Sequence, residues 1–319
     1  MGWKWISFGI LCLVLLFQYK NISSYIAVEL ALSGFKELDV NSDDVIDKSE
    51  WPGIGFSIVD VDRDNLVDDE EIRLFIREFS KRLLKLTDND IPVVLVVGNH
   101  DIPAIKQRAT SLDIFPTMNI DKVTVIDKLK LYTVDTKNNG PIQIIGLPWP
   151  RFGTFTTNIR KSNPKIKVEE ITKSVVDLFD SNISKELTKV DKKLPCIFTG
   201  HLSVMEAKTS TETLMSITND PLLSSQFFIK PEFEYVGLGH IHKDQVLNEN
   251  PPVVYSGSLE RVDFGEKNDE KGFYIIDLDL NKSQGNRLIS YKKIKVKARN
   301  FNEIKIKIPK NEIYPSKYI

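Results

Sequence analysis

The residues best suited to chemistry in this 319-residue chain are its four histidines, because each lies in a short glycine-containing motif after an apolar run. They are His100 in the tetrapeptide 98–101, His201 directly after Gly200, and His240 and His242 in the tetrapeptide 239–242. Neutral imidazole is the commonest protein ligand for transition metals, and Asn or Asp oxygens complete mixed shells. A single such histidine is more often an ordinary core or surface residue, but four out of four predict a metal site.

The apolar runs before these motifs predict strands. Residues 91–97 form a continuous apolar run, as expected for a strand buried on both faces. Residues 196–199 lead into His201, and residues 235–238 lead into His240. Open α/β sheets place ligand crevices at the carboxyl ends of their strands, so we expect the motifs to meet at one sheet edge. Further strands are expected at 122–126, 131–134, 142–145, 253–255, 272–278, 288–296 and 303–308, and helices from Asp68 onward and over 168–190.

Two acidic segments, 39–50 and 60–71, carry oxygen side chains at the positions that an EF-hand calcium loop requires. Asp44 and Asn65 replace the usual glycine at position 6, where both tolerate a positive φ. A solvated acidic loop is the simpler alternative, but it does not explain two matched copies. The pair is similar to compact EF-hand tandems and implies Ca²⁺. Its predicted ligands are Asp39, Asn41, Asp43, Val45, Asp47 and Glu50 in the first loop, and Asp60, Asp62, Asp64, Leu66, Asp68 and Glu71 in the second.

The remaining composition bears on compartment and partners. Lys and Arg number 43 against 44 Asp and Glu, so bulk charge argues neither for nor against nucleic acid. The two cysteines are expected to be unpaired thiols. The uncharged run Trp5–Phe17 matches the apolar core of a signal peptide and falls short of a bilayer span. We therefore expect an exported or membrane-tethered protein; a buried N-terminal element of a cytoplasmic protein is the alternative.

Residues 91–308 resemble the calcineurin-like metallophosphoesterases, and among them the SbcD-type DNA repair exonucleases. The stretches that carry the resemblance are 92–101, 146–150, 237–243 and 251–266. The resemblance implies an α/β fold, a metallophosphoesterase sandwich of mixed β-sheets flanked by helices, with a small helical EF-hand module in front. The expected domains are a leader at 1–29, the EF-hand pair with its connecting helix at 30–86, and the phosphoesterase domain at 87–319.

The resemblance also implies roles for the histidine motifs. In that family two divalent metals, usually Mn²⁺, activate water for attack on a phosphodiester, here of DNA or a nucleotide. Asn99, His201 and His240 match ligands of one metal, and His242 matches a ligand of the other. His100 matches the catalytic histidine, which Asp101 would orient.

The chain departs from the family pattern before Gly98. The family's Asp-x-His and Gly-Asp motifs are absent, and the acidic pair stands in their place. Counting back without gaps puts the lost bridging carboxylate near residues 60–64, which the second calcium loop already uses. We therefore expect an exonuclease fold truncated at its first strands, with impaired turnover. Alternatives are an exported calcium-binding protein with a non-catalytic scaffold, or two unrelated genes joined.

The family resemblance also bears on the partners expected for this chain. The chain reaches Ile319 soon after the phosphoesterase region, which argues against assembly with the family's ATPase partner; a homodimer stays open. A lysine-rich strand near the end could meet phosphates, although lysines on an edge strand more often form a solvated face. These lysines are Lys292, Lys293, Lys295 and Lys297.

Overall fold

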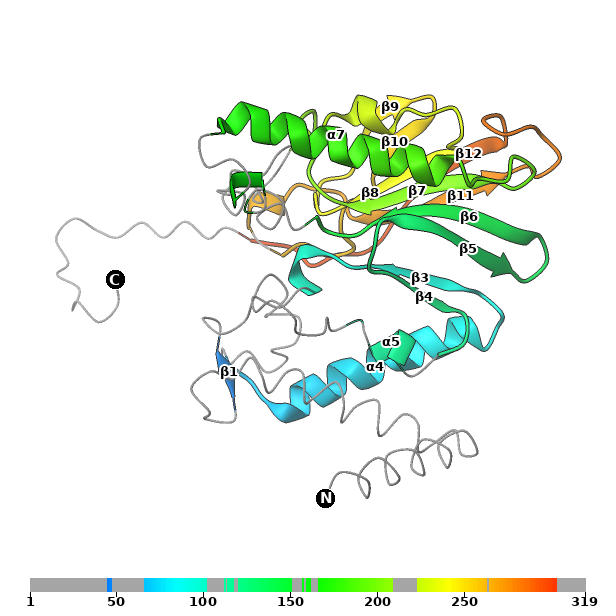
Figure 1. The fold of residues 1–319 in the computed structure, drawn as a ribbon. Coiled ribbons are helices and arrows are strands. Elements are labelled where there is room, and N and C mark those ends of the chain that lie inside the picture. The colour runs from blue at the N-terminus through cyan, green and yellow to red at the C-terminus, as the bar shows by residue number, and fades with distance from the viewer. Residues whose placement is uncertain are drawn as a thin grey trace, which may run out of the picture.

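The computed structural model describes residues 45–47, 66–101, 112, 114–117, 120–150, 157, 159–161, 166–208, 223–262 and 264–302. These residues form a layered α/β arrangement around one six-stranded sheet (Figure 1). Helix α7 (Val168–Leu187) covers one face of that sheet. The strand pair β3–β4 lies on the other side, with α4 (Asp69–Thr87) and α5 (Ile114–Thr117) beyond it.

The six-stranded sheet has the order β5-β6-β7-β8-β10-β9. β5 and β6 form an antiparallel hairpin that turns at Gly140, where φ is +72°. β6, β7, β8 and β10 run parallel to one another, so their carboxyl ends share one edge. The strands are β5 (Lys130–Thr136), β6 (Gly140–Leu147), β7 (Cys196–His201), β8 (Tyr235–Gly239), β10 (Pro252–Tyr255) and β9 (Gln245–Glu249).

The two faces of this sheet bury separate apolar clusters. On the helix side, alternate residues of β7 such as Cys196 and Phe198 join Val175 and Ile183 of α7, and all four are fully buried. Side chains i, i+2 of a strand share a face, so Ile197 belongs instead to the opposite cluster. Because successive side chains of β7 point to opposite faces, one short apolar strand contributes to the clusters on both sides of the sheet.

The second layer is the parallel pair β3 (Val93–Val96) and β4 (Val123–Ile126). Its residue Ile126 is fully buried and packs in one cluster with Tyr132 and Ile144 of the large sheet. A Cβ on Gly146 would lie 2.5 Å from Ile126 Cγ2. Glycine at this position of β6 therefore lets the two layers approach.

Helix α4 begins at a capping box. The Asp68 carboxylate accepts a hydrogen bond from Glu71 N at 2.9 Å, and the Glu71 carboxylate accepts one from Asp68 N at 3.4 Å. Such a box satisfies two of the orphan N–H groups at a helix start. Just before the helix, β1 (Ile46–Asp47) pairs antiparallel with β2 (Leu66–Val67).

The antiparallel hairpin β11 (Gly272–Leu278) and β12 (Leu288–Lys295) completes the described fold. Arg287, at its turn, is buried and pairs with the buried Glu234 just before β8 at 3.2 Å. The same guanidinium donates to the carbonyls of Lys192, Lys193 and Leu194 before β7. One buried ion pair thus ties the hairpin to the start of two central strands.

Most expected elements are confirmed, with two corrections. The strand at 91–97 was expected to be buried on both faces, yet all four residues of β3 are only half-buried in the two-stranded layer that it forms with β4. The polar strand β9 was not expected, because its sequence lacks an apolar run. The expected strand 303–308 lies outside the described residues, as does Cys12, whereas Cys196 is a buried free thiol.

Candidate metal site

The first motif forms a tight turn at the carboxyl end of β3. Residues Asn99–Asp101 make a 3₁₀ turn. The Asp101 carboxylate accepts a hydrogen bond from Gly98 N at 2.7 Å, which closes the turn on itself. This contact of Asp101 is with the backbone. The side chain of His100 lies outside the described part of the structure, so its expected catalytic role, and its orientation by Asp101, stay predictions.

Three of the predicted ligands come together at the shared edge of the strands. His201 Nε2 lies 2.9 Å from Asn99 Oδ1, and His240 Nδ1 lies 3.4 Å from the same oxygen. The two imidazole rings are 5.4 Å apart between centroids, at an angle of 67°. Residues separated by more than a hundred positions in sequence thus place two ring nitrogens and one amide oxygen around a single point.

These distances fit a shared divalent cation. Ligand atoms about 2.1 Å from an octahedral ion are about 3 Å from their neighbours. The two separations from Asn99 Oδ1 match that edge length. Within the part of the chain that the structure describes, no three His, Cys, Asp or Glu side chains gather closely enough to hold a metal. The candidate shell therefore depends on an amide as its third donor.

Small and aromatic neighbours fix where the rings lie. A Cβ on Gly98 would stand 2.9 Å from His201 Cε1, so glycine lets that imidazole lie where it does without a shift. The indole of Trp149 packs on His240 with ring centroids 4.7 Å apart, and its backbone N donates to Val97 O at 2.8 Å. His240 itself has a φ of +96°, a region that non-glycine residues seldom occupy and that clusters at functional sites.

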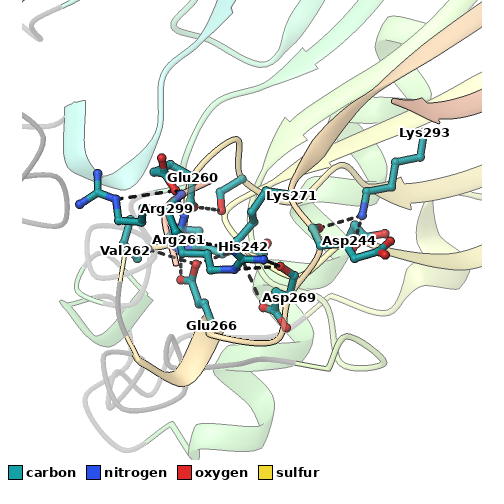
Figure 2. Close-up of polar contacts among 12 residues, drawn as sticks. His242, Asp244, Glu260, Arg261, Val262, Glu266, Asp269, Lys271, Lys293 and Arg299 are labelled. Atoms are coloured by element: carbon teal, nitrogen blue, oxygen red, sulfur yellow. Dashed lines mark hydrogen bonds and ion pairs between the residues drawn. The ribbon is translucent and has the colours of Figure 1, made fainter. Parts of the chain in front are cut away.

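His242, the fourth predicted ligand, has a different environment (Figure 2). Its Nδ1 lies 2.7 Å from Glu266 Oε1. The other carboxylate oxygen of Glu266 lies 2.7 Å from Lys271 Nζ, and both of these side chains are fully buried. Lys271 Nζ also donates to the His242 carbonyl at 3.2 Å. The histidine is therefore held at its ring and at its backbone by the same buried pair.

Sequence reasoning missed three residues of this region: Glu266, Lys271 and Trp149. Each lies in or near a stretch that carries the family resemblance, but charged residues are ordinarily read as surface. The sequence feature that could have pointed to Glu266 and Lys271 is their position in or just after residues 251–266, a stretch that carries the family resemblance.

Two of the three lysines of β12 form ion pairs. Lys293 Nζ lies 2.6 Å from Asp244 Oδ1, and this pair is mostly buried (Figure 2). Lys295 Nζ lies 2.5 Å from Glu270 Oε1 in an exposed pair, as the simpler interpretation of a solvated face expects.

Most of the predicted calcium ligands lie outside the described residues, namely Asp39, Asn41, Asp43, Glu50, Asp60, Asp62 and Asp64. Asp68 and Glu71 are described, and they form the capping box of α4. Val45, Asp47 and Leu66 lie in or beside the β1–β2 pair, where Ile46 faces Val67.

Fold and site together define a class. The parallel strands and the second strand layer give the chain an α/β fold of mixed sheets flanked by helices, which is consistent with a metallophosphoesterase fold. The predicted resemblance is confirmed: its homologues are the SbcD and Mre11 nucleases. No protein-family model matches the chain.

Three of these relatives illustrate the match. The SbcD component of nuclease SbcCD from Staphylococcus epidermidis is 25% identical over 191 residues, 60% of this chain and 47% of that protein. DNA double-strand break repair protein Mre11 of Methanocaldococcus jannaschii is 26% identical over 232 residues, 71% of this chain and 52% of its own. The SbcD component of nuclease SbcCD from Escherichia coli is 23% identical over 207 residues, 64% and 50% respectively. The chain spans about half the length of these relatives.

The expectation of export or a membrane tether is wrong. The relatives are named as a nuclease subunit and as DNA double-strand break repair proteins, and neither is the name of an exported or membrane-bound protein. In the described residues, every helix is too short or too polar to cross a bilayer.

Proposed function

We propose that the protein is a divalent-metal-binding phosphodiesterase of the SbcD type that acts on DNA with reduced turnover. The observation that carries the proposal is the convergence of Asn99, His201 and His240 on one point with the spacing of a coordination shell. The names of the relatives support DNA as the substrate class.

The proposal gives each described residue a limited task. A bound Mn²⁺ would neutralise phosphoryl oxygens and lower the pKa of a coordinated water. Asn99, His201 and His240 would hold it, and Trp149 would keep one wall of the site apolar. Turnover would be reduced because the Asp-x-His and Gly-Asp motifs of two-metal relatives are missing from the sequence. The expectation against an ATPase partner, the open possibility of a homodimer and the domain limits at 29/30 and 86/87 stay predictions.

A titration with Mn²⁺ tests the metal part of the proposal. We expect a tight equivalent, detected by calorimetry or by the loss of free Mn²⁺ resonance signal, that is weakened on the order of a hundredfold in His201→Ala, which loses a direct ligand. His242→Ala should leave this equivalent in place and serves as the matched histidine control. Equal binding by the wild type and His201→Ala would refute the proposed site.

Hydrolysis of linear duplex DNA in the presence of Mn²⁺ tests the turnover part. We expect slow nucleotide release that EDTA abolishes and that His100→Ala reduces further. Rapid release that disappears in His100→Ala would contradict the impaired site, because it would show that ligands beyond the described set complete it. Hydrolysis unaffected by His100→Ala, by His201→Ala and by EDTA would refute the phosphodiesterase assignment.

A second candidate function, calcium binding by an EF-hand pair, is favoured by one observation. The register of β1 and β2 sets Ile46 opposite Val67, and these are the eighth residues of the two predicted loops. A short antiparallel pair between the same positions is what two loops folded side by side would form. The capping box of α4 also places Glu71, at position 12, on the first turn of the following helix.

Variants at the twelfth loop positions test calcium binding. Glu50→Gln and Glu71→Gln each remove a bidentate carboxylate and should weaken Ca²⁺ binding on the order of tenfold or more. Glu70→Gln, an exposed neighbour outside the ligand pattern, is the control. Trp51 fluorescence during a Ca²⁺ titration supplies the measurement. Identical titration curves for all three variants and the wild type would contradict the EF-hand proposal.

A further inference from the structure

We infer that Glu266, held by Lys271, is a positioning residue that fixes the tautomer of His242. In this tautomer Nδ1 carries the proton and Nε2 carries the lone pair, which prepares Nε2 to coordinate a divalent cation. The inference rests on the proposed metal-binding function for its purpose. Its geometric basis is independent of that function, because it concerns contacts within the chain (Figure 2).

The two oxygens of the Glu266 carboxylate have separate partners. Oε2 accepts from Lys271 Nζ at 2.7 Å and from Val262 N at 3.3 Å. Oε1 lies 2.7 Å from His242 Nδ1. An ionised carboxylate can only accept hydrogen bonds, so the group facing Oε1 must donate. A neutral imidazole has a single N–H, and that N–H is consequently at Nδ1.

Burial makes this arrangement rigid. Glu266 and Lys271 are both 0% exposed, and a buried charge is costly unless it is paired and hydrogen-bonded. Lys271 serves two ends of the same histidine, because its ammonium meets the Glu266 carboxylate and donates to the His242 carbonyl at 3.2 Å. The ring and the backbone of His242 therefore cannot shift independently.

The Glu234–Arg287 pair, a second buried ion pair among the described residues, has a different set of contacts. Glu234 directs both oxygens to Arg287 and to the backbone N–H groups of Gly285 and Arg287. Its contacts tie chain segments together. Glu266 instead reserves one oxygen for a side chain that carries chemistry. The N–H of a metal-ligating histidine is usually directed at such a carboxylate, which sets its tautomer and raises its basicity.

A glutamine at position 266 gives a sharp test. Beside the Lys271 ammonium, the amide of Glu266→Gln is expected to turn its oxygen toward Nζ and its NH₂ toward His242. Nδ1 then has to accept, so the proton moves to Nε2 and the tautomer inverts. Removal of such a partner commonly weakens metal binding by roughly 10–100-fold. Any Mn²⁺ that His242 binds, separate from the ion held by Asn99, His201 and His240, should therefore bind more weakly by that factor.

The tautomer is measured by long-range ¹H–¹⁵N correlation spectra of the imidazole groups in the metal-free full chain, at an alkaline pH where free imidazole is neutral. His242→Gln identifies the resonance by its disappearance. We expect the Nδ1–H tautomer in the wild type and the Nε2–H tautomer in Glu266→Gln. Glu234→Gln, which disturbs a buried carboxylate of the same kind, should retain the wild-type spectrum.

A wild-type His242 that is Nε2-protonated, doubly protonated or a mixture of tautomers would overturn the inference, even if Glu266→Gln does not fold. An equal change in Glu234→Gln would also overturn it, because the effect would then reflect general destabilisation. Failure of the proposed function is separate: a wild type that binds no Mn²⁺ refutes that function, whereas the spectra still decide the role of Glu266.

Discussion

At the scale of single residues, the candidate site depends on how closely backbone and imidazole can approach. Gly98 lies under the ring of His201, and a Cβ on Gly239 would stand 3.1 Å from His201 Nδ1. The ring is thus confined between Gly98, which follows β3, and Gly239, the last residue of β8. Its position relative to Asn99 follows from this confinement as much as from any hydrogen bond.

Gly98→Ala should displace His201 without unfolding the protein. The new Cβ would lie 2.9 Å from His201 Cε1, so the ring has to move by a few tenths of an ångström, and we expect Mn²⁺ affinity to fall on the order of tenfold. Gly140→Asn is the control, because that turn has a φ of +72°, which Asn tolerates, and open space around it. Unchanged Mn²⁺ binding in Gly98→Ala would show that the ring position is not critical.

The sequence predicted the donors but not what holds them. His201 and His240 could be recognised because each follows an apolar run and a glycine. Glu266 and Lys271 could not, because the burial of a charged residue depends on a partner that the local pattern does not reveal. The convergence of Asn99 with both imidazoles depends on strand order, which the sequence alone leaves open.

At the scale of elements, the parallel strands were predictable from continuous Val- and Ile-rich runs, whereas β9 was not. Polar contacts of Arg287 attach the hairpin β11–β12 to the sheet. Arg287 and Glu234 are both nearly inaccessible, and the guanidinium also binds three carbonyls before β7. An attachment of this kind has a large cost when one partner is removed.

Arg287→Ala should therefore lower the free energy of unfolding by about 3–5 kcal/mol, since it leaves the Glu234 carboxylate buried without its partner. Arg82→Ala is the matched control: that arginine pairs with Glu78 on the exposed face of α4, where a pair contributes about 0.5 kcal/mol or less. Urea denaturation followed by far-ultraviolet circular dichroism gives both values. Similar losses in the two variants would mean that the hairpin is not anchored by this pair.

At the scale of the whole molecule, the described layers bury three tyrosines: Tyr132, Tyr235 and Tyr255. Tyr255 donates its hydroxyl to Leu202 O at 2.7 Å, directly after His201, and Tyr132 donates to Lys128 O at 3.0 Å. Burial raises the pKa of Tyr132 to about 12 and raises the pKa of Tyr235 and Tyr255 as well. The core thus resists ionisation that the unfolded chain undergoes.

This predicts alkaline destabilisation. An unfolded tyrosine loses its proton near pH 10, so above that pH the unfolded state binds fewer protons than the folded state and the free energy of unfolding falls. The contribution of protonated Tyr132 to the free energy of unfolding is complete below about pH 10 and is lost as the pH rises toward 12. Urea midpoints between pH 8 and 11.5 measure the fall. Tyr132→Phe should make the fall shallower while costing about 1 kcal/mol at neutral pH for the lost hydrogen bond.

An unaltered alkaline profile in Tyr132→Phe would contradict this account. Mn²⁺ that binds the folded protein would itself raise the urea midpoints, so both pH profiles are recorded without Mn²⁺. The pH dependence of unfolding thus measures the buried layers, and the affinity for Mn²⁺ measures the candidate site.

The complete enclosure of Lys271 has a practical consequence. Acylating reagents attack free amines that water can reach, so lysines such as Lys81 and Lys295, both more than half exposed, should react within the first minutes of treatment. Lys271, at 0% exposure, should react only during excursions in which its surroundings come apart. Mass-spectrometric mapping of acylated peptides over time would therefore give the acylation rate of Lys271. That rate measures how often the protein opens around His242.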